Sequence, residues 1–146
     1  MGAWWINKAQ RAEFYMMSQV ELGSLRIAKA LSYACGHWDE LAALLDEDEA
    51  PLRAVEDAVG RPPADDVSLA VLLDALHAAV RRAGDPSGIY GGTGRSVTPA
   101  GVADLDVVYR CPLQLCIGRS GHEVGDDVPL CQVASVETAL IRERLP

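Results

Sequence analysis

Three of the four cysteines lie in one window of 21 residues, from Cys111 to Cys131. Cys111 and Cys116 are separated by four residues, a spacing close to that of the tight turns that supply two ligands to zinc in small folds. Pro112 stiffens such a turn, and Gly118 lets backbone amides approach the sulfur atoms. The remaining ligands of a zinc site come from a second element. A zinc site here therefore requires a fold in which a second element lies beside this turn and supplies the remaining ligands.

A short apolar segment leads into each half of this window. Asp106–Arg110 is the strongest strand candidate and runs directly into Cys111, and Val128–Leu130 leads into Cys131 in the same manner. A strand that ends in a cysteine, twice in succession, is the layout of a zinc ribbon. We also expect Arg110 and Arg119 to moderate the negative charge of bound thiolates.

The residues after Cys131 contain no cysteine or histidine where the second half of a ribbon would supply its last ligand. His122 is the first candidate, which gives Cys111, Cys116, His122 and Cys131 as the ligands of a structural zinc ion. Cys35, from the helical part, is a second candidate and would join the two parts of the chain. Two alternatives remain open: a ribbon that folds without metal around small buried cysteines, and a redox pair of Cys111 and Cys116.

The window resembles zinc-ribbon-type knuckles and, more loosely, the short Cys-Pro-x3-Cys … Pro-x-Cys tails of actinobacterial regulatory and conflict-system proteins. The matching residues are Cys111-Pro112, Cys116, the segment from Val124 to Pro129, and Cys131. The resemblance covers under a fifth of the chain and implies a bacterial protein with a structural zinc tail.

Residues 1–84 predict a helical bundle. We expect helices at residues 7–35, 39–45, 51–59 and 67–83, the first three closed by Gly36, by an acidic run before Pro51 and by Gly60. The clearest helix, Val67–Ala83, has Asp65 or Asp66 as its N-cap and ends at Gly84. The apolar face expected for it consists of Leu69, Leu72, Leu73, Leu76 and Val80, widened by Val71 and Ala79.

Glycines mark the end of the helical part. The segment Asp85–Val97 is rich in glycine, but it lacks the lysine of a P-loop and follows a helix rather than a strand. We therefore predict a bundle over residues 1–84, a linker or loop over 85–103, and a ribbon-like region over 104–146. A last helix, Val136–Leu145, is expected with Ser135 as its cap. The fold class is mainly α, a helical bundle followed by a small β, zinc-ribbon-like region with a terminal helix.

The net charge of the chain limits the kinds of partner that we expect. The net charge is −8, and neither half is basic, with net −6 over residues 1–88 and net −2 over residues 89–146. Nucleic-acid binding draws much of its affinity from cationic side chains, so we expect no nucleic-acid partner. No run approaches the roughly 18 apolar residues of a spanning helix, so we expect a cytoplasmic protein with no membrane partner. In that compartment clustered cysteines favour metal ligands or reactive thiols over disulfides.

No nucleophile–base pair, phosphate-binding loop or carboxylate dyad stands out in the sequence. We therefore predict a non-enzymatic protein-interaction or regulatory module, such as an adaptor, whose partner is another protein or a second copy. Three alternatives remain: a thiol-dependent enzyme that uses Cys35 and His37, a redox switch at Cys111 and Cys116, and a transcription regulator. His77, beside the apolar face of its helix, is expected to be structural.

Overall fold

The computed structural model describes residues 23–61, 65–91, 107–121, 124, 127–133 and 138–144. In these ranges a group of helices precedes a small antiparallel sheet, so the mainly helical class with a small β region is confirmed. The helices are residues 23–36, α2 (Trp38–Leu45), the 3-10 turn η1 (Asp46–Asp48), α3 (Ala50–Val59), α4 (Asp66–Arg82) and α5 (Gly88–Gly91). The strands are β1 (Val107–Arg110), β2 (Arg119–Ser120) and β3 (Ile141–Arg144).

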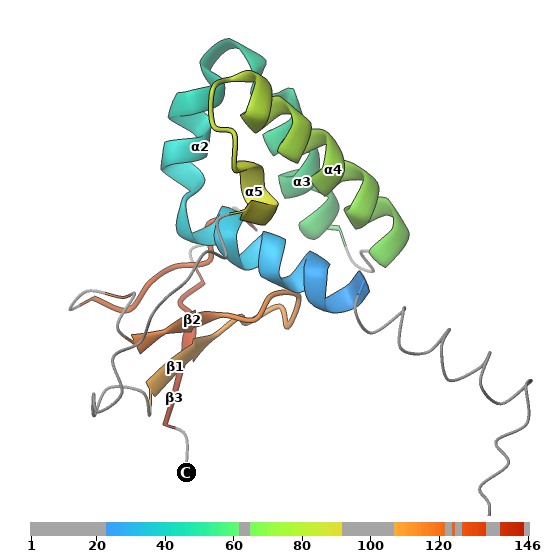
Figure 1. Ribbon diagram of the computed structural model, residues 1–146. Helices are drawn as coiled ribbons and strands as arrows, with labels where there is room; N and C mark the ends of the chain where they lie inside the picture. The colour runs from blue at the N-terminus through green and yellow to red at the C-terminus, as the bar shows by residue number, and fades with distance from the viewer. Residues whose placement is uncertain are drawn as a thin grey trace, which may run out of the picture.

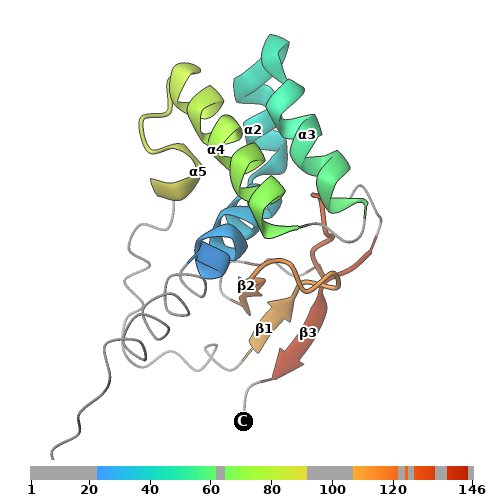
Figure 2. The same cartoon turned by 90° about the vertical axis from the view of Figure 1, so that its right-hand side faces the viewer.

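The helix of residues 23–36 lies between the other helices and the sheet, as two perpendicular views show (Figure 1, Figure 2). Most of its apolar residues are accordingly buried, Leu31 and Ala34 among them, and Cys35 is buried near its end, whereas Leu25 near its start is exposed. This helix is the described part of the one predicted at residues 7–35, whose earlier residues lie outside the described ranges. We call the helix of residues 23–36 the central helix. Because it lies between the other helices and the sheet, it can bring Cys35 to the sheet region.

The limits of α2, α3 and α4 confirm the predicted helices to within one residue at each end. Pro51 stands in the first turn of α3, where its missing N–H has no helical partner to lose. Asp65 caps α4, since its carboxylate accepts a hydrogen bond from the Ser68 amide at 2.8 Å. Among the described residues, no helix is both long enough and apolar enough to cross a membrane.

The core runs without interruption from the helices into the sheet region. Leu52 and Val55 of α3 and Leu73 of α4 are fully buried at its centre. Cys131 and Val133, which come from the end of the chain, belong to the same buried cluster. These described residues of the sheet region therefore share one buried cluster with the helices.

Val71 was predicted to widen the buried face of α4, and this prediction is wrong because its side chain is 64% exposed. Leu69 and Leu73, which are fully buried, stand two residues to either side of it. Two residues correspond to roughly 200° around a helix, so Val71 faces the opposite side. The apolar residues of α4 thus form two faces instead of one broad face.

The predicted terminal helix is also wrong for the residues described, because Ile141–Arg144 forms β3. It pairs antiparallel with β1, from Val107 opposite Arg144 to Arg110 opposite Ile141, and the strand order is β2-β1-β3. Just before β3, the Leu140 amide donates to the Pro129 carbonyl at 2.8 Å and turns the chain back on itself. Pairing with a distant strand satisfies these backbone groups and outweighs the modest helical preference of the segment.

Part of the predicted linker is a short helix rather than a loop. Residues 88–91 form α5, and Ile89 is fully buried against the helices. Residues 92–106, which include the rest of the glycine-rich stretch, lie outside the described ranges. The predicted domain limits therefore stay predictions.

Candidate functional site

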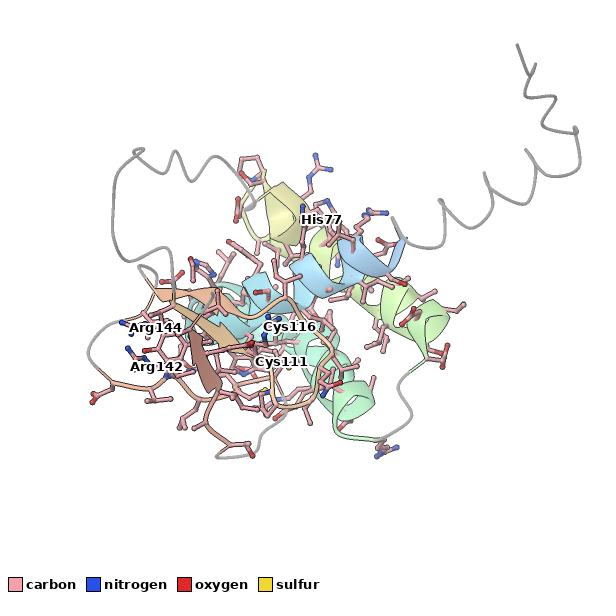
Figure 3. The ribbon with its side chains drawn as sticks, turned by 90° about the horizontal axis from the view of Figure 1, so that it is seen from below. His77, Cys111, Cys116, Arg142 and Arg144 are labelled. Carbon is pink, nitrogen blue, oxygen red and sulfur yellow. The ribbon has the colours of Figure 1, made fainter. Side chains whose placement is uncertain are left out.

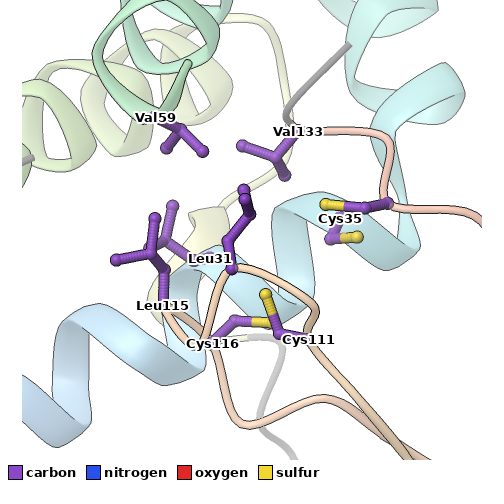
Figure 4. A pocket seen from close by; sticks show the side chains of 9 residues that line it. Leu31, Cys35, Val59, Cys111, Leu115, Cys116 and Val133 are labelled. Atoms are coloured by element: carbon purple, nitrogen blue, oxygen red, sulfur yellow. The ribbon is translucent and has the colours of Figure 1, made fainter. Parts of the chain in front are cut away.

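All four cysteines line one pocket between the helix of residues 23–36 and the sheet region (Figure 4). They come from three places in the sequence: the end of that helix, the turn between β1 and β2, and the segment before β3. The pocket has a volume of about 10 Å³, which is about the least that holds a single water molecule. It has room for an ion but not for an organic substrate. The other lining residues are Leu31, Val59, Leu113, Leu115 and Val133.

The four thiols form a connected series. The Cys131 side chain interacts with both Cys35 and Cys111, and Cys111 interacts with Cys116. Cys111 and Cys116 lie side by side in the turn after β1, below the central helix (Figure 3). None of the four cysteines is in a disulfide, and only Cys116 is partly exposed. Each thiol is therefore within contact of at least one other.

Backbone amides point at three of these sulfur atoms. Such N–H to sulfur hydrogen bonds favour the thiolate over the thiol, because they place positive charge beside the anion. The donors are the amides of Leu115 and Cys116 to Cys111, of Gly118 to Cys116, and of Gln132 to Cys35. The backbone is thus arranged for anionic sulfur at this pocket.

Gly118 makes one of these contacts possible. Its φ of +79° lies in the left-handed region, which side chains disfavour. A Cβ at this position would stand 2.2 Å from the carbonyl oxygen of Tyr109 on β1. The Ser32 hydroxyl also donates to the Gly118 carbonyl, which ties the turn to the central helix. The predicted role of Gly118, to let an amide approach a cysteine sulfur, stays a prediction, and the positive φ and the close approach to β1 agree with it.

Arg119 brings a positive charge to the pocket. One terminal nitrogen, Nη2, donates to the Cys35 carbonyl at 2.7 Å and lies 3.2 Å from the Cys35 sulfur. Its Nε is buried and has no hydrogen-bond partner in the described part of the chain. The predicted role of Arg119 beside the sulfurs is therefore supported, whereas Arg110 forms an exposed ion pair with Glu143.

These contacts shift the pKa values of the thiols. The pKa of Cys35 falls to about 5, first because of the hydrogen bond from Cys131 and then because of the Gln132 amide and Arg119, against the opposing effect of burial. The pKa of Cys111 is lowered by its hydrogen bonds with Cys116 and Cys131. The pKa of Cys116 is raised because its proton is held in the bond to Cys111 and because it is buried. The surroundings of the pocket therefore favour the thiolate at Cys35 and Cys111 and the thiol at Cys116.

The predicted metal ligands are brought together in part. Cys111, Cys116 and Cys131 share the pocket, while His122 lies outside the described residues. Cys35, the alternative fourth ligand, is in the pocket. As the side chains stand, no group of three or more histidine, cysteine, aspartate or glutamate residues within the described ranges is arranged so that it could hold a metal ion.

Cys35 and His37 were a candidate nucleophile and base, but their side chains have separate partners. The Nδ1 atom of His37 lies 3.0 Å from the Tyr33 carbonyl oxygen, and its ring stacks on Tyr33 with centroids 4.3 Å apart. The sulfur of Cys35 interacts instead with Cys131 and Arg119. The geometry gives the thiol-enzyme alternative no support at this pair.

A polar cluster that the sequence did not reveal holds α5 against α4. The Tyr90 hydroxyl donates to Asp74 at 2.7 Å, and the Arg26 guanidinium lies 4.0 Å above the Tyr90 ring. Burial raises the pKa of Tyr90, and the hydrogen bond to Asp74 adds to this effect. The His77 ring is 4.8 Å from that of Tyr90 and lies apart from the cysteine pocket (Figure 3). These contacts join separate segments, so no local pattern could indicate them.

The outer side of α4 carries an exposed apolar row, which we call the α4 stripe: Val67, Val71, Ala75 and Ala78. Val67 is 76% exposed and Val71 64% exposed, and both alanines are exposed as well. Their spacing of four, four and three residues places them on one helix face. The row was missed because its residues were assigned to a single broad face, although the periodicity allows a second one.

No family model matches the chain, and neither a curated protein nor a solved structure matches it. The similarity of the cysteine window to zinc-ribbon tails therefore stays a prediction that rests on the window's own residues.

Proposed function

We propose that the chain is a non-enzymatic protein-interaction module with a regulatory role, and that it docks through the α4 stripe. The observation that carries this proposal is the exposure of Val67 and Val71, two large apolar side chains one turn apart on a helix that is otherwise well packed. Exposed apolar rows on a helix are a common basis of helix-to-helix docking. The small cysteine pocket, by contrast, has no room for an organic substrate.

The occupant that fits the stripe is α4 of a second copy in antiparallel orientation. The stripe has valines toward its N-terminal end and alanines toward its C-terminal end, so an antiparallel pair places each valine against an alanine. The ends of α4 are also of opposite charge, with Asp66 in the first turn and Arg81 and Arg82 in the last. A two-fold axis brings these opposite charges together at both ends of the contact.

The expected association is weak. A single helix face buries less than the roughly 1,200 Å² of a standard specific interface, so the dissociation constant should be roughly micromolar or higher. Weak self-association of this kind suits a regulatory module whose state depends on its concentration.

Sedimentation velocity over a wide concentration range tests the proposal. The wild-type chain should change from monomer to dimer as its concentration rises, and Val71→Glu should remain monomeric. Val128→Glu is the matched control, since Val128 is also exposed, at 48%, but lies in the sheet region. A monomer at every concentration, or equal dimerisation of the wild type and Val71→Glu, would contradict the proposal. Binding of the stripe to a different protein would then be the remaining form of an interaction module.

A redox switch at Cys111 and Cys116 is a second candidate, because these two thiols are in contact and the pKa of Cys111 is lowered. With a hydroperoxide as oxidant, the Cys111 thiolate would attack the peroxide oxygen, and Cys116 would displace the hydroxide from the sulfenic acid as water. The two thiols lose two hydrogens and form a disulfide, and the hydroperoxide is reduced to an alcohol and water. Mass spectrometry of peptides after peroxide treatment should find this disulfide. Only sulfinic acid or unchanged thiols would exclude this candidate.

A further inference from the structure

We propose that Cys35, Cys111, Cys116 and Cys131 together bind one zinc ion, which fastens the central helix to the sheet region. This assignment places Cys35 in the position that the sequence pattern left open and His122 outside the ligand set. It is independent of the docking surface on α4, which is formed by other residues. It concerns what holds the module together rather than what the module binds.

The first support for the zinc site is that all four cysteines lie at one pocket. Cys35 is 76 residues before Cys111 in the sequence, yet its sulfur faces the same small pocket and contacts Cys131. Buried cysteines can pack anywhere in a core as small apolar side chains. All four cysteines of the chain share one pocket instead, and this is the number of ligands that a structural zinc site requires.

The second support is the backbone around the sulfurs. Backbone amides lower the pKa values of Cys35 and Cys111 and oppose the rise at Cys116, and the positive φ of Gly118 lets the turn lie close against β1. Apolar packing of thiols needs no such donors. Hydrogen bonds of this kind orient metal-bound sulfur and distribute its charge. The turn between β1 and β2 therefore provides two of the ligands, Cys111 and Cys116, together with amides beside their sulfurs.

The third support is charge. Four thiolates and one zinc ion carry a net charge of −2, which is unfavourable in the buried core of an acidic chain. Arg119 supplies a compensating positive charge, 3.2 Å from the Cys35 sulfur, and the Cys35 carbonyl holds it in place. Its buried Nε has no other partner in the described residues, so the side chain is directed to the pocket at a desolvation cost.

The described side chains must rearrange to bind the ion, since no three of them are arranged for it as they stand. Four sulfurs around zinc at 2.3 Å are separated by roughly 3.8 Å from one another. Rotation of a cysteine about χ1 from one staggered well to the next moves its sulfur by roughly 3 Å. All four thiols line one small pocket, so the proposal requires side-chain rotations of this size about χ1 to bring the four sulfurs around one ion.

The ligand set also selects the metal and its role. Tetrahedral sites of four thiolates take zinc or iron, and in the absence of redox chemistry zinc is preferred. With four protein ligands, no coordination position is left for water or substrate. The site is thus structural rather than catalytic.

The test begins with the wild-type chain, prepared under reducing conditions. Native mass spectrometry and elemental analysis should find one zinc ion per chain. Cobalt(II), used as the probe after removal of zinc, should give the visible and thiolate charge-transfer bands of a tetrahedral four-sulfur site. Absence of metal together with failure to bind cobalt would overturn the proposal, as would iron in place of zinc or a spectrum of three sulfurs and one nitrogen. These measurements need no variant and therefore do not depend on whether a mutant folds.

Two variants then identify the fourth ligand. Cys35→Ser should lower the affinity for cobalt by well over tenfold, since loss of even an outer-shell partner typically costs about 10- to 100-fold. His122→Ala should leave the affinity unchanged. Ser32→Ala is the matched control, because Ser32 is on the same helix and contacts the same turn through Gly118 without a metal-binding atom. If His122→Ala loses the metal while Cys35→Ser retains it, the assignment of Cys35 is wrong.

Discussion

Gly118 offers the sharpest test of how the sheet region is joined to the helices. The change to alanine adds one methyl group to a residue with a φ of +79°, directly beside β1. Two separate penalties follow from the structure. The first is the backbone conformation, which only glycine adopts easily. The second is a collision with the main chain of Tyr109, which cannot move aside as a flexible side chain would.

The two penalties can be given magnitudes. A residue other than glycine in a sparsely populated conformation costs about 1–3 kcal/mol. The new Cβ would stand 2.2 Å from the Tyr109 oxygen, whereas real contacts stay above 3.0 Å, so β1 or the turn must move by about 0.8 Å. Forcing an added group into a packed site costs typically a further 1–3 kcal/mol. We therefore expect Gly118→Ala to lower the free energy of unfolding by about 2–6 kcal/mol, a large share of the roughly 5–15 kcal/mol of a small domain.

Two other glycines separate these contributions. Gly84 has a φ of +118° but nothing within 4 Å of an added Cβ, so Gly84→Ala carries the conformational penalty alone. Gly60 has a φ of −73°, and its added Cβ would meet only ordinary contacts, so Gly60→Ala should be neutral or slightly stabilising. Urea unfolding followed by far-ultraviolet circular dichroism would rank the three variants.

The expected order of destabilisation is Gly118→Ala, then Gly84→Ala, then Gly60→Ala. The difference between the first two should be about 1–3 kcal/mol, the cost of the collision. If Gly118→Ala and Gly84→Ala agree within about 0.5 kcal/mol, the close approach between the turn and β1 is not a feature of the folded protein, and the reasoning fails.

Three further predictions concern the helices. Leu76→Ala should lower the free energy of unfolding by about 2–5 kcal/mol because Leu76 is fully buried, whereas exposed Val67→Ala should change it by no more than about 0.5 kcal/mol in a urea titration of the monomer. Tyr90→Phe removes the hydrogen bond to Asp74, so thermal unfolding should show a loss of about 1 kcal/mol; an unchanged transition would contradict that bond. The Ser68 amide lowers the folded-state pKa of Asp65 below its ordinary 3.8. The ionised Asp65 therefore stabilises the fold at pH values above 3.8, and this stabilisation is lost as the pH falls through the lowered pKa. Asp65→Ser keeps a cap but should abolish that part of the acid-side loss of stability in denaturation curves measured from pH 6 to 2.

The helices could be predicted from the sequence because their limits are set by local residues. Asp65 caps α4, Pro51 stands in the first turn of α3, and Gly84, with its positive φ, follows the C-cap of α4. Each of these residues acts on its immediate neighbours through backbone geometry or one hydrogen bond. Knowledge of the rest of the molecule was not needed to place them.

Features that depend on distant contacts could not be predicted in this way. Ile141–Arg144 is a strand because β1 pairs with it, and no pattern within the segment itself indicates that pairing. Val71 has the same chemistry as a buried valine, and only the position of the neighbouring helices decides which face of α4 is covered. Cys35 could be named as a candidate for the pocket, but only the packing of the central helix shows that it reaches the other cysteines.

The residues that complete the core are synthesised long after the helix of residues 23–36 that they cover. Leu31 and Cys35 belong to the same buried cluster as Cys131 and Val133, which follow about a hundred residues later. Folding begins at the N-terminal side during synthesis, so the side of the central helix that faces Cys131 and Val133 stays uncovered until those residues have been made. During that interval the nascent protein is a candidate substrate for chaperones. A stop codon anywhere before Cys131 would leave the helical part permanently in this aggregation-prone form.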